Sequence, residues 1–213
     1  MGKYVKGILG AISGLVGTVV GASYNGIDYL RSRPKKSTKP KTEAQLEQQM
    51  VFELVGDFVR QILDEIRVGF QTHKKGQSAY SAAMGENLKE GVTGVYPALA
   101  LNYSKLVMSK GGLKKPSDAE VAATDPGELE ITWVNNARPG TPSLTDKATV
   151  IVYNADKEEF VTMPAAAARS LETYTLQVPA DFAGDMVHTW MYFVSVNGKK
   201  VSDSVYVGSV LVV

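Results

Sequence analysis

The spacing of apolar positions predicts a helix in the middle of the chain. Between residues 43 and 69, apolar side chains recur at every fourth position: Leu46, Met50, Leu54, Phe58, Ile62 and Ile66. This spacing places them on one face of an amphipathic helix, with polar and charged residues opposite. We expect the apolar stripe to be buried against a second helix and against the N-terminal segment of the chain.

Start and stop signals bound this first helix. Thr42 and Gln45 have the spacing of a capping box, in which the Thr hydroxyl accepts from the backbone N–H of Gln45 and the Gln side chain accepts from the N–H of Thr42. The helix is predicted to run to about Gly69, with a bend near Gly56. Glycine lowers helix stability, so a bend there is reasonable.

A second helix and a strand follow. Ser78 can cap a helix over 79–91, with its apolar side turned toward the first helix. The alternation of residues 98–108 predicts a strand. The stretch 111–116 is rich in glycine and lysine and ends in proline, which marks a boundary between two regions, 1–115 and 116–213.

From residue 116 onward, period-two alternation predicts short strands separated by turns. Leu129, Ile131 and Trp133 share one face of a strand, and the same alternation recurs over 148–153, 173–178 and 190–196. Six or seven short strands without a long helix are typical of an immunoglobulin- or fibronectin-III-like antiparallel β-sandwich. The predicted fold class is therefore α+β, with a glycine-rich N-terminal β-hairpin and two or three helices preceding the sandwich.

The N-terminal segment contains 21 residues without a charged side chain, 7–27. A membrane-spanning helix needs about 20 mostly apolar residues, and the six glycines in this run argue against one. A secretory signal would be cleaved near Val20-Gly21-Ala22. We expect instead that the segment is retained, with synthesis in the cytoplasm. A third interpretation is a helix with one glycine face, which would need a partner because each glycine costs about 1 kcal/mol relative to alanine.

The fourth interpretation, which we favour, is a β-hairpin. Residues 16–23 are rich in β-branched side chains, Asn25-Gly26 suits a type I′ turn, and residues 27–33 alternate. An isolated hairpin is at best marginally stable in water, so it needs another sheet or another chain. An uncharged strand is also a template for strand addition. Eight residues are therefore candidate assembly contacts: Gly10, Gly14, Gly17, Val19, Val20, Gly21, Tyr24 and Tyr29.

A basic stretch with two prolines follows, and an extended, solvated linker is its simplest interpretation. Its cations are also candidates for contact with phosphate or an acidic partner. They are Arg31, Arg33, Lys35, Lys36, Lys39 and Lys41. Residues 31–41 contain no aromatic side chain on which the bases of a single strand could stack.

The net charge of +1 hides a gradient along the chain. Residues 1–42 carry +7, residues 43–115 carry +1 and residues 116–213 carry −7. Such a chain can stack head to tail, with the basic arm of one copy against the acidic sandwich of the next. Charge would then set the orientation while apolar contact holds the joint, since exposed ion pairs contribute only about 0–1 kcal/mol each.

Several kinds of chemistry are excluded or lack support. Cysteine is absent, which excludes disulfides, thiolate catalysis and Cys-ligated metal centres. The chain contains no phosphate-binding loop, dinucleotide fingerprint, nucleophile elbow or His-Glu-x-x-His motif. We assign no catalytic residue and no cofactor.

No metal site is assigned either. Asp57 with Asp64, and Asp181 with Asp185, are carboxylate pairs that could contact a cation, but neither pair has an evident third ligand. The second histidine of the chain, His188, is expected to have a structural role.

Several segments resemble a known family. They are 6–10, 16–21, 26–32, 34–36, Lys41-Thr-Glu-Ala-Gln45, 179–185 and 204–208. Together they are similar, over the whole length, to a bacterial domain-of-unknown-function family. The resemblance implies neither an activity nor site residues. The glycine-rich hairpin, with Tyr29-x-Arg31 and the Thr42-x-x-Gln45 helix start, more weakly resembles structural proteins of phages or mobile elements.

We therefore expect a non-enzymatic structural or assembly protein. Its N-terminal segment would join a homo-oligomer or a larger multi-subunit particle, virion-like or at a surface. The alternatives are a nucleic-acid-binding protein that uses the 31–41 arm, or a surface binding module. A membrane partner is not expected. Assembly by apolar pairing should survive high salt, whereas phosphate binding should weaken steeply.

Overall fold

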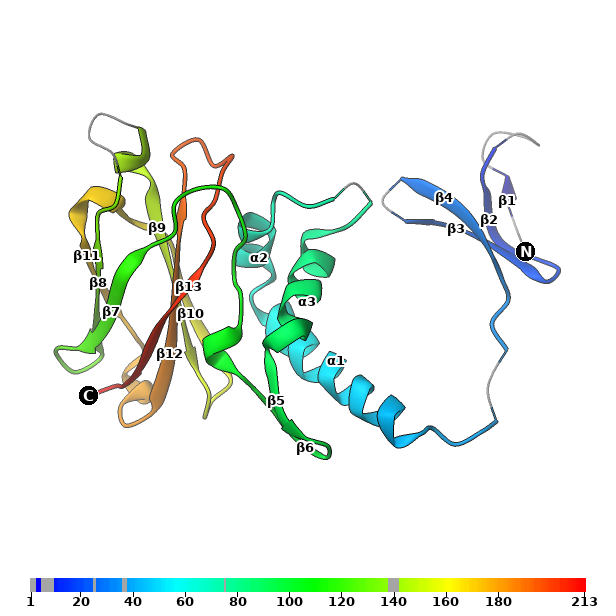
Figure 1. Cartoon of the computed structure of the whole chain (residues 1–213), viewed down its shortest axis with the longest axis horizontal. Coiled ribbons are helices and arrows are strands. Elements are labelled where there is room, and N and C mark those ends of the chain that lie inside the picture. The colour runs from blue at the N-terminus through cyan, green and yellow to red at the C-terminus, as the bar shows by residue number, and fades with distance from the viewer. Residues whose placement is uncertain (1–2, 5–9, 25, 36–37, 75, 138–141) are drawn as a thin grey trace.

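The computed structural model describes residues 3–4, 10–24, 26–35, 38–74, 76–137 and 142–213. Within these residues lie three α-helices and four antiparallel sheets. Figure 1 shows the helices in the middle of the molecule, between a sandwich of two sheets and a separate N-terminal sheet. Among the described helices, none has the length and apolar character needed to cross a bilayer.

Helix α1 (Glu43–Gln61) begins at the predicted capping box. Gln45 N donates to Thr42 Oγ1 at 3.4 Å, and Thr42 N donates to Gln45 Oε1 at 3.1 Å. The prediction of one helix to Gly69 is wrong in one respect. The backbone departs from helical geometry at Ile62 (φ −114°, ψ 36°), and a separate helix, α2 (Leu63–Gly69), follows.

Gly56 lies within the continuous helix α1. It is buried where α1 meets α3 (Ala79–Glu90), and the Tyr80 hydroxyl lies 3.3 Å from the position that a Cβ on Gly56 would occupy. The glycine thus allows close helix packing. The predicted cap of α3 is confirmed, because Ser81 N donates to Ser78 Oγ at 3.1 Å.

A short hairpin follows α3, made of β5 (Val92–Val95) and β6 (Ala98–Leu101). The strand predicted over 98–108 therefore ends at Leu101. The chain then forms a short 3₁₀ turn, Tyr103–Lys105, before entering the sandwich.

Two sheets form the sandwich. Its strands are β7 (Ser117–Ala123), β8 (Glu128–Val134), β9 (Lys147–Asn154), β10 (Glu159–Ala168), β11 (Thr173–Gln177), β12 (Met186–Val194) and β13 (Val205–Leu211). One sheet has the order β11-β8-β7 and the other β10-β9-β12-β13, all antiparallel. The chain crosses between the two sheets from β8 to β9, from β10 to β11 and from β11 to β12, as in an immunoglobulin- or fibronectin-III-like sandwich. The sequence pattern did not reveal β7 or β10.

The four-stranded sheet is covered on both faces. Along β9, Val150 and Val152 face the three-stranded sheet, whereas Ile151 and Tyr153 belong to a second core shared with the helices. The stripe of α1 and α2 is therefore buried against this sheet and against α3, not against the N-terminal segment. Toward the start of α1 the stripe is partly solvent-exposed, and 37% of Leu46 is accessible.

Candidate functional site

The N-terminal segment is a sheet of four strands. They are β1 (Lys3–Tyr4), β2 (Ile12–Val16), β3 (Val19–Tyr24) and β4 (Ile27–Ser32), paired antiparallel in chain order. The predicted hairpin region corresponds to β3 and β4. Gly26 has the positive φ of 77° that the turn between them requires. Asn25, Lys36 and residues 5–9 lie outside the described residues.

The described glycines of this segment lie in or beside the strands of this sheet and do not form one face of a helix. Gly14 of β2 lies opposite Gly21 of β3, and Gly17 occupies the turn between these strands with φ 57°. A Cβ on Gly21 would collide with the backbone carbonyl of Ile12. Small residues are therefore needed here because the backbone of β2 passes directly over β3. Gly10 stands two residues before β2.

The pairing register assigns side chains to the two faces of the sheet. Residues directly opposite each other in an antiparallel ladder share a face, and so do residues two apart. One face, called here the tyrosine face, carries Leu15, Val20, Ala22, Tyr24, Ile27, Tyr29 and Arg31. The other face carries Val16, Val19, Gly21 and Leu30. Exposed fractions of 44% for Tyr29 and 60% for Leu30 show that apolar side chains on both faces remain in contact with solvent.

The sheet meets the rest of the protein at the tip of its β3–β4 hairpin. The Tyr24 and Ser81 hydroxyls are hydrogen-bonded at 3.2 Å. The Cδ1 atom of Ile27 lies 2.8 Å from the position that a Cβ on Gly76 would occupy. Figure 1 shows the remainder of the sheet extending away from the helices. The candidate assembly residues beyond the tip are thus not covered by the helices or the sandwich.

The basic residues are spread between strand β4 and the start of α1. Arg31 is on the tyrosine face, whereas Arg33 N continues the ladder by donating to Thr18 O at 2.9 Å. Lys35 lines an open groove of about 600 Å³ beside Thr18. At the other end, Lys41 Nζ donates to Gln49 Oε1 of α1 at 2.7 Å. The described members of this set are therefore divided between the end of β4 and the first turns of α1.

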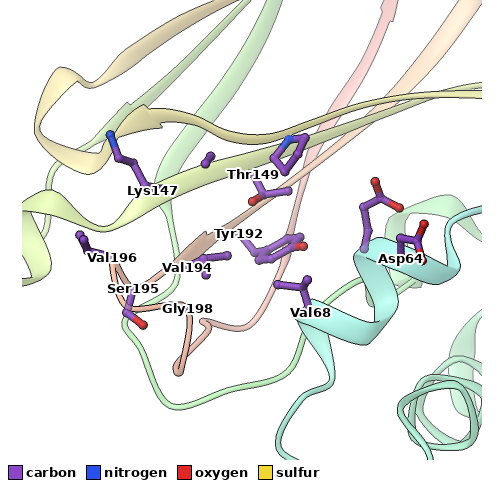
Figure 2. A pocket seen from close by; sticks show the side chains of 12 residues that line it. Asp64, Val68, Lys147, Thr149, Tyr192, Val194, Ser195, Val196 and Gly198 are labelled. Atoms are coloured by element: carbon purple, nitrogen blue, oxygen red, sulfur yellow. The ribbon is translucent and has the colours of Figure 1, made fainter.

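A separate cavity of about 380 Å³ lies between α2 and the four-stranded sheet of the sandwich, β10-β9-β12-β13 (Figure 2). Its lining is mostly apolar, with Val68, Tyr192 and Val194 on its walls. Asp64, Glu65 and Lys147 carry its charges near the surface. Burial raises the pKa of the Tyr192 phenol, and the nearby Glu65 carboxylate raises it further. This arrangement suits an apolar group better than acid–base chemistry. Sequence reasoning missed it because its residues come from distant segments.

The carboxylate pairs considered for a cation have protein partners. Lys157 Nζ lies 3.0 Å from Asp185 Oδ2 and 3.3 Å from Asp181 Oδ2, so an ammonium group already stands between these two carboxylates. Asp57 pairs with Arg60 at 2.5 Å, and Asp64 pairs with Arg67. Within the described part of the chain, no three Asp, Glu or His side chains are grouped as a metal site would require.

His188 belongs to an aromatic cluster on the outer face of the four-stranded sheet. Its Nδ1 lies 2.9 Å from the Tyr206 hydroxyl, and its ring stacks on Tyr103 with the centroids 4.0 Å apart. Burial lowers the pKa of the imidazole. These contacts fit a packing role.

The chain is thus an α+β protein that has an immunoglobulin- or fibronectin-III-like sandwich and a layer of helices on one of the two sheets of the sandwich. Residues 11–208 match the family of unknown function DUF6266. The chain belongs to this family, which confirms the resemblance to a domain-of-unknown-function family. The match does not show the weaker resemblance to structural proteins of phages or mobile elements. No curated protein sequence matches the chain.

Solved structures similar to the chain contain fibronectin-III-like domains. The fn3 domain of human collagen alpha-1(XX) chain has 17% identity and a TM-score of 0.33, over 47% of this chain and 85% of that one. The chicken interferon gamma receptor alpha chain has 12% identity and a TM-score of 0.38, over 57% of this chain and 63% of that one. With such low scores, they add nothing to the fold class that the strand order establishes.

Proposed function

We propose that this protein is a non-enzymatic structural module that associates with other subunits through its N-terminal sheet, either as a homo-oligomer or within a larger particle. The observation that carries the proposal is the exposure of this sheet. All six residues of β4 are exposed, and apolar side chains on both faces lack cover from the helices and the sandwich.

Physical reasoning supports a partner for this surface. A sheet normally buries at least one face, and an isolated small sheet is only marginally stable in water. Monomeric proteins rarely expose large contiguous apolar patches, and those that do usually present an interaction site. Nine residues separate Ser32 from Thr42, and a chain of this length can reach at most roughly 30 Å, which gives the sheet room to meet a partner.

The test is the mass of the protein in solution, measured by light scattering over a concentration series. We expect the full-length chain to form an assembly that persists at high salt, and deletion of residues 2–32 to give a folded monomer. Tyr29→Ser should weaken the assembly. The matched control is Phe52→Ser, which changes an equally exposed aromatic on α1 and should leave the assembly intact. A full-length monomer at every concentration would refute the proposal.

A further inference from the structure

The free edge of β4 has a defined set of unpaired backbone groups. Arg33 N donates to Thr18 O, so this pair is of the hydrogen-bonded type. Hydrogen-bonded pairs alternate along an antiparallel ladder, so Ile27, Tyr29 and Arg31 turn their N–H and C=O groups toward β3. Asp28, Leu30 and Ser32 then turn theirs toward the outer edge. Within the described part of the chain, no backbone group is hydrogen-bonded to these outward groups.

This edge lacks the proline and the bulge that often prevent strand addition. The edge strand β10 of the sandwich, by contrast, contains Pro164, a residue with φ 54° at Ala165, and a break in register between Met163 and Ala167. Proline and bulges blunt an edge. β4 contains neither, and its register with β3 is continuous over all six residues. Its charges, Asp28 and Arg31, have opposite signs and therefore do not repel a second copy.

We propose that β4 pairs antiparallel with β4 of a second copy of this chain, about a two-fold axis at Leu30. The two N-terminal sheets then form one continuous sheet. This inference rests on the proposed function and names the partner and the register. A two-fold axis normal to the sheet keeps the tyrosine faces of both copies on the same side. Opposing residues must therefore lie on the same face of the sheet, so their residue numbers must both be odd or both be even.

The axis at Leu30 matches the chemistry of the strand best. It places Leu30 against its own copy, which covers an apolar side chain that is 60% exposed. It places Tyr29 opposite Arg31 of the other copy, a cation–π arrangement formed twice. It also places the Asp28 carboxylate opposite the Ser32 hydroxyl. An axis at Tyr29 would instead set Asp28 against Leu30 and Arg31 against Ile27, so that both charges would face apolar side chains.

Cross-linking tests the register directly, because the natural chain has no cysteine to interfere. Residues opposite each other in an antiparallel pair have Cα atoms about 5.5 Å apart when hydrogen-bonded, within the range of a disulfide. We expect mild oxidation to convert Leu30→Cys into a covalent dimer several-fold more efficiently than Val95→Cys. Val95 is the matched control, since it is an exposed strand residue far from this edge.

Four further variants complete the experiment. Asp28→Cys and Ser32→Cys chains should cross-link when mixed, and each should do so poorly alone. Leu30→Lys, which opposes two lysines at the axis, should weaken self-association at least tenfold with an unchanged circular dichroism spectrum. If the wild type assembles but Leu30→Cys forms no more dimer than Val95→Cys, or less than Tyr29→Cys, the β4 pairing is refuted while the proposed function stands. A monomeric wild type refutes both.

Discussion

Phe58 of α1 and Trp190 of β12 meet edge to face, with ring centroids 6.0 Å apart and both side chains buried. Phe58 makes similar edge contacts with Tyr153 at 5.2 Å and with Phe160 at 5.0 Å. These aromatic contacts attach the helices to the outer face of the four-stranded sheet. The helical layer and the sandwich therefore share one hydrophobic core.

This contact predicts that the Phe58→Ala variant is strongly destabilised. Removing a buried Phe leaves a cavity between helix and sheet, so we expect a loss of about 3–5 kcal/mol in the free energy of unfolding. Urea denaturation followed by tryptophan fluorescence measures it. The matched control is Phe52→Ala on the same helix, where 50% of the side chain is exposed and the change should stay within about 0.5 kcal/mol. Equal losses in the two variants would contradict the shared core.

A fragment of residues 116–213 tests the predicted division of the chain. Trp133 is buried within the sandwich and donates from Nε1 to Arg169 O at 2.9 Å, whereas Trp190 belongs to the core shared with the helices. We expect the fragment to unfold cooperatively with Trp133 protected and Trp190 exposed. Acrylamide quenching of Trp133→Phe and Trp190→Phe fragments separates the two signals. Quenching of both tryptophans at the rate of free indole would show that the sandwich does not fold alone.

Local signals in the sequence were sufficient for part of this fold. Thr42 and Ser78 start their helices as predicted, because a cap depends on residues three positions away. The break at Ile62 and the strand β10 could not be read locally, since long-range packing decides them. The sequence also does not show that β12 is buried on both faces, by the helices on one side and by the three-stranded sheet on the other. Alternation shows which side chains share a face but not that helices cover the second face.

The candidate site likewise combines features that the local sequence predicts with features that depend on long-range contacts. The strands near Asn25-Gly26 follow from turn chemistry and alternation. Which side chains share the tyrosine face depends on a pairing register that only the structure supplies. The contact of the Tyr24 hydroxyl with Ser81 joins residues 57 positions apart, and no pattern in the sequence indicates it.

A buried ion pair that the sequence did not reveal gives the next prediction. The Arg169 guanidinium is inaccessible to solvent, lies 3.1 Å from Asp146 Oδ2, donates to Asn136 Oδ1 at 2.6 Å and stacks on Phe193. Arg169→Met leaves the buried Asp146 carboxylate without its cation, so we expect a loss of about 3–5 kcal/mol. Thermal and urea unfolding measure this loss.

Two variants control for the Arg169 result. Arg60→Met removes an exposed Arg–Asp pair and should cost no more than about 1 kcal/mol. The double variant Arg169→Met/Asp146→Leu should recover part of the stability, because it removes the unpaired charge as well. If the double variant were as unstable as the summed losses of the Arg169→Met and Asp146→Leu single variants, packing rather than charge would explain the loss.

The last prediction concerns His188 and pH. Burial lowers its pKa in the folded protein, whereas an unfolded histidine titrates near 6.5. As the pH falls through about 6.5, the unfolded chain therefore takes up a proton at this residue before the folded chain does, which favours unfolding. The stability that neutral His188 contributes is complete above that pH and is lost as the pH falls toward the folded pKa.

The His188→Gln variant removes this titration and isolates its effect. The difference in unfolding free energy between wild type and His188→Gln, measured by urea denaturation, should decrease between about pH 7.5 and pH 5.5. Glutamine can still hydrogen-bond the Tyr206 hydroxyl, which limits the cost of the substitution itself. The matched control is His73→Gln, which replaces an exposed histidine and should leave the stability nearly unchanged. A difference for His188→Gln that grows on acidification would mean that the folded protein favours the imidazolium, opposite to what burial beside Tyr103 and Tyr206 predicts.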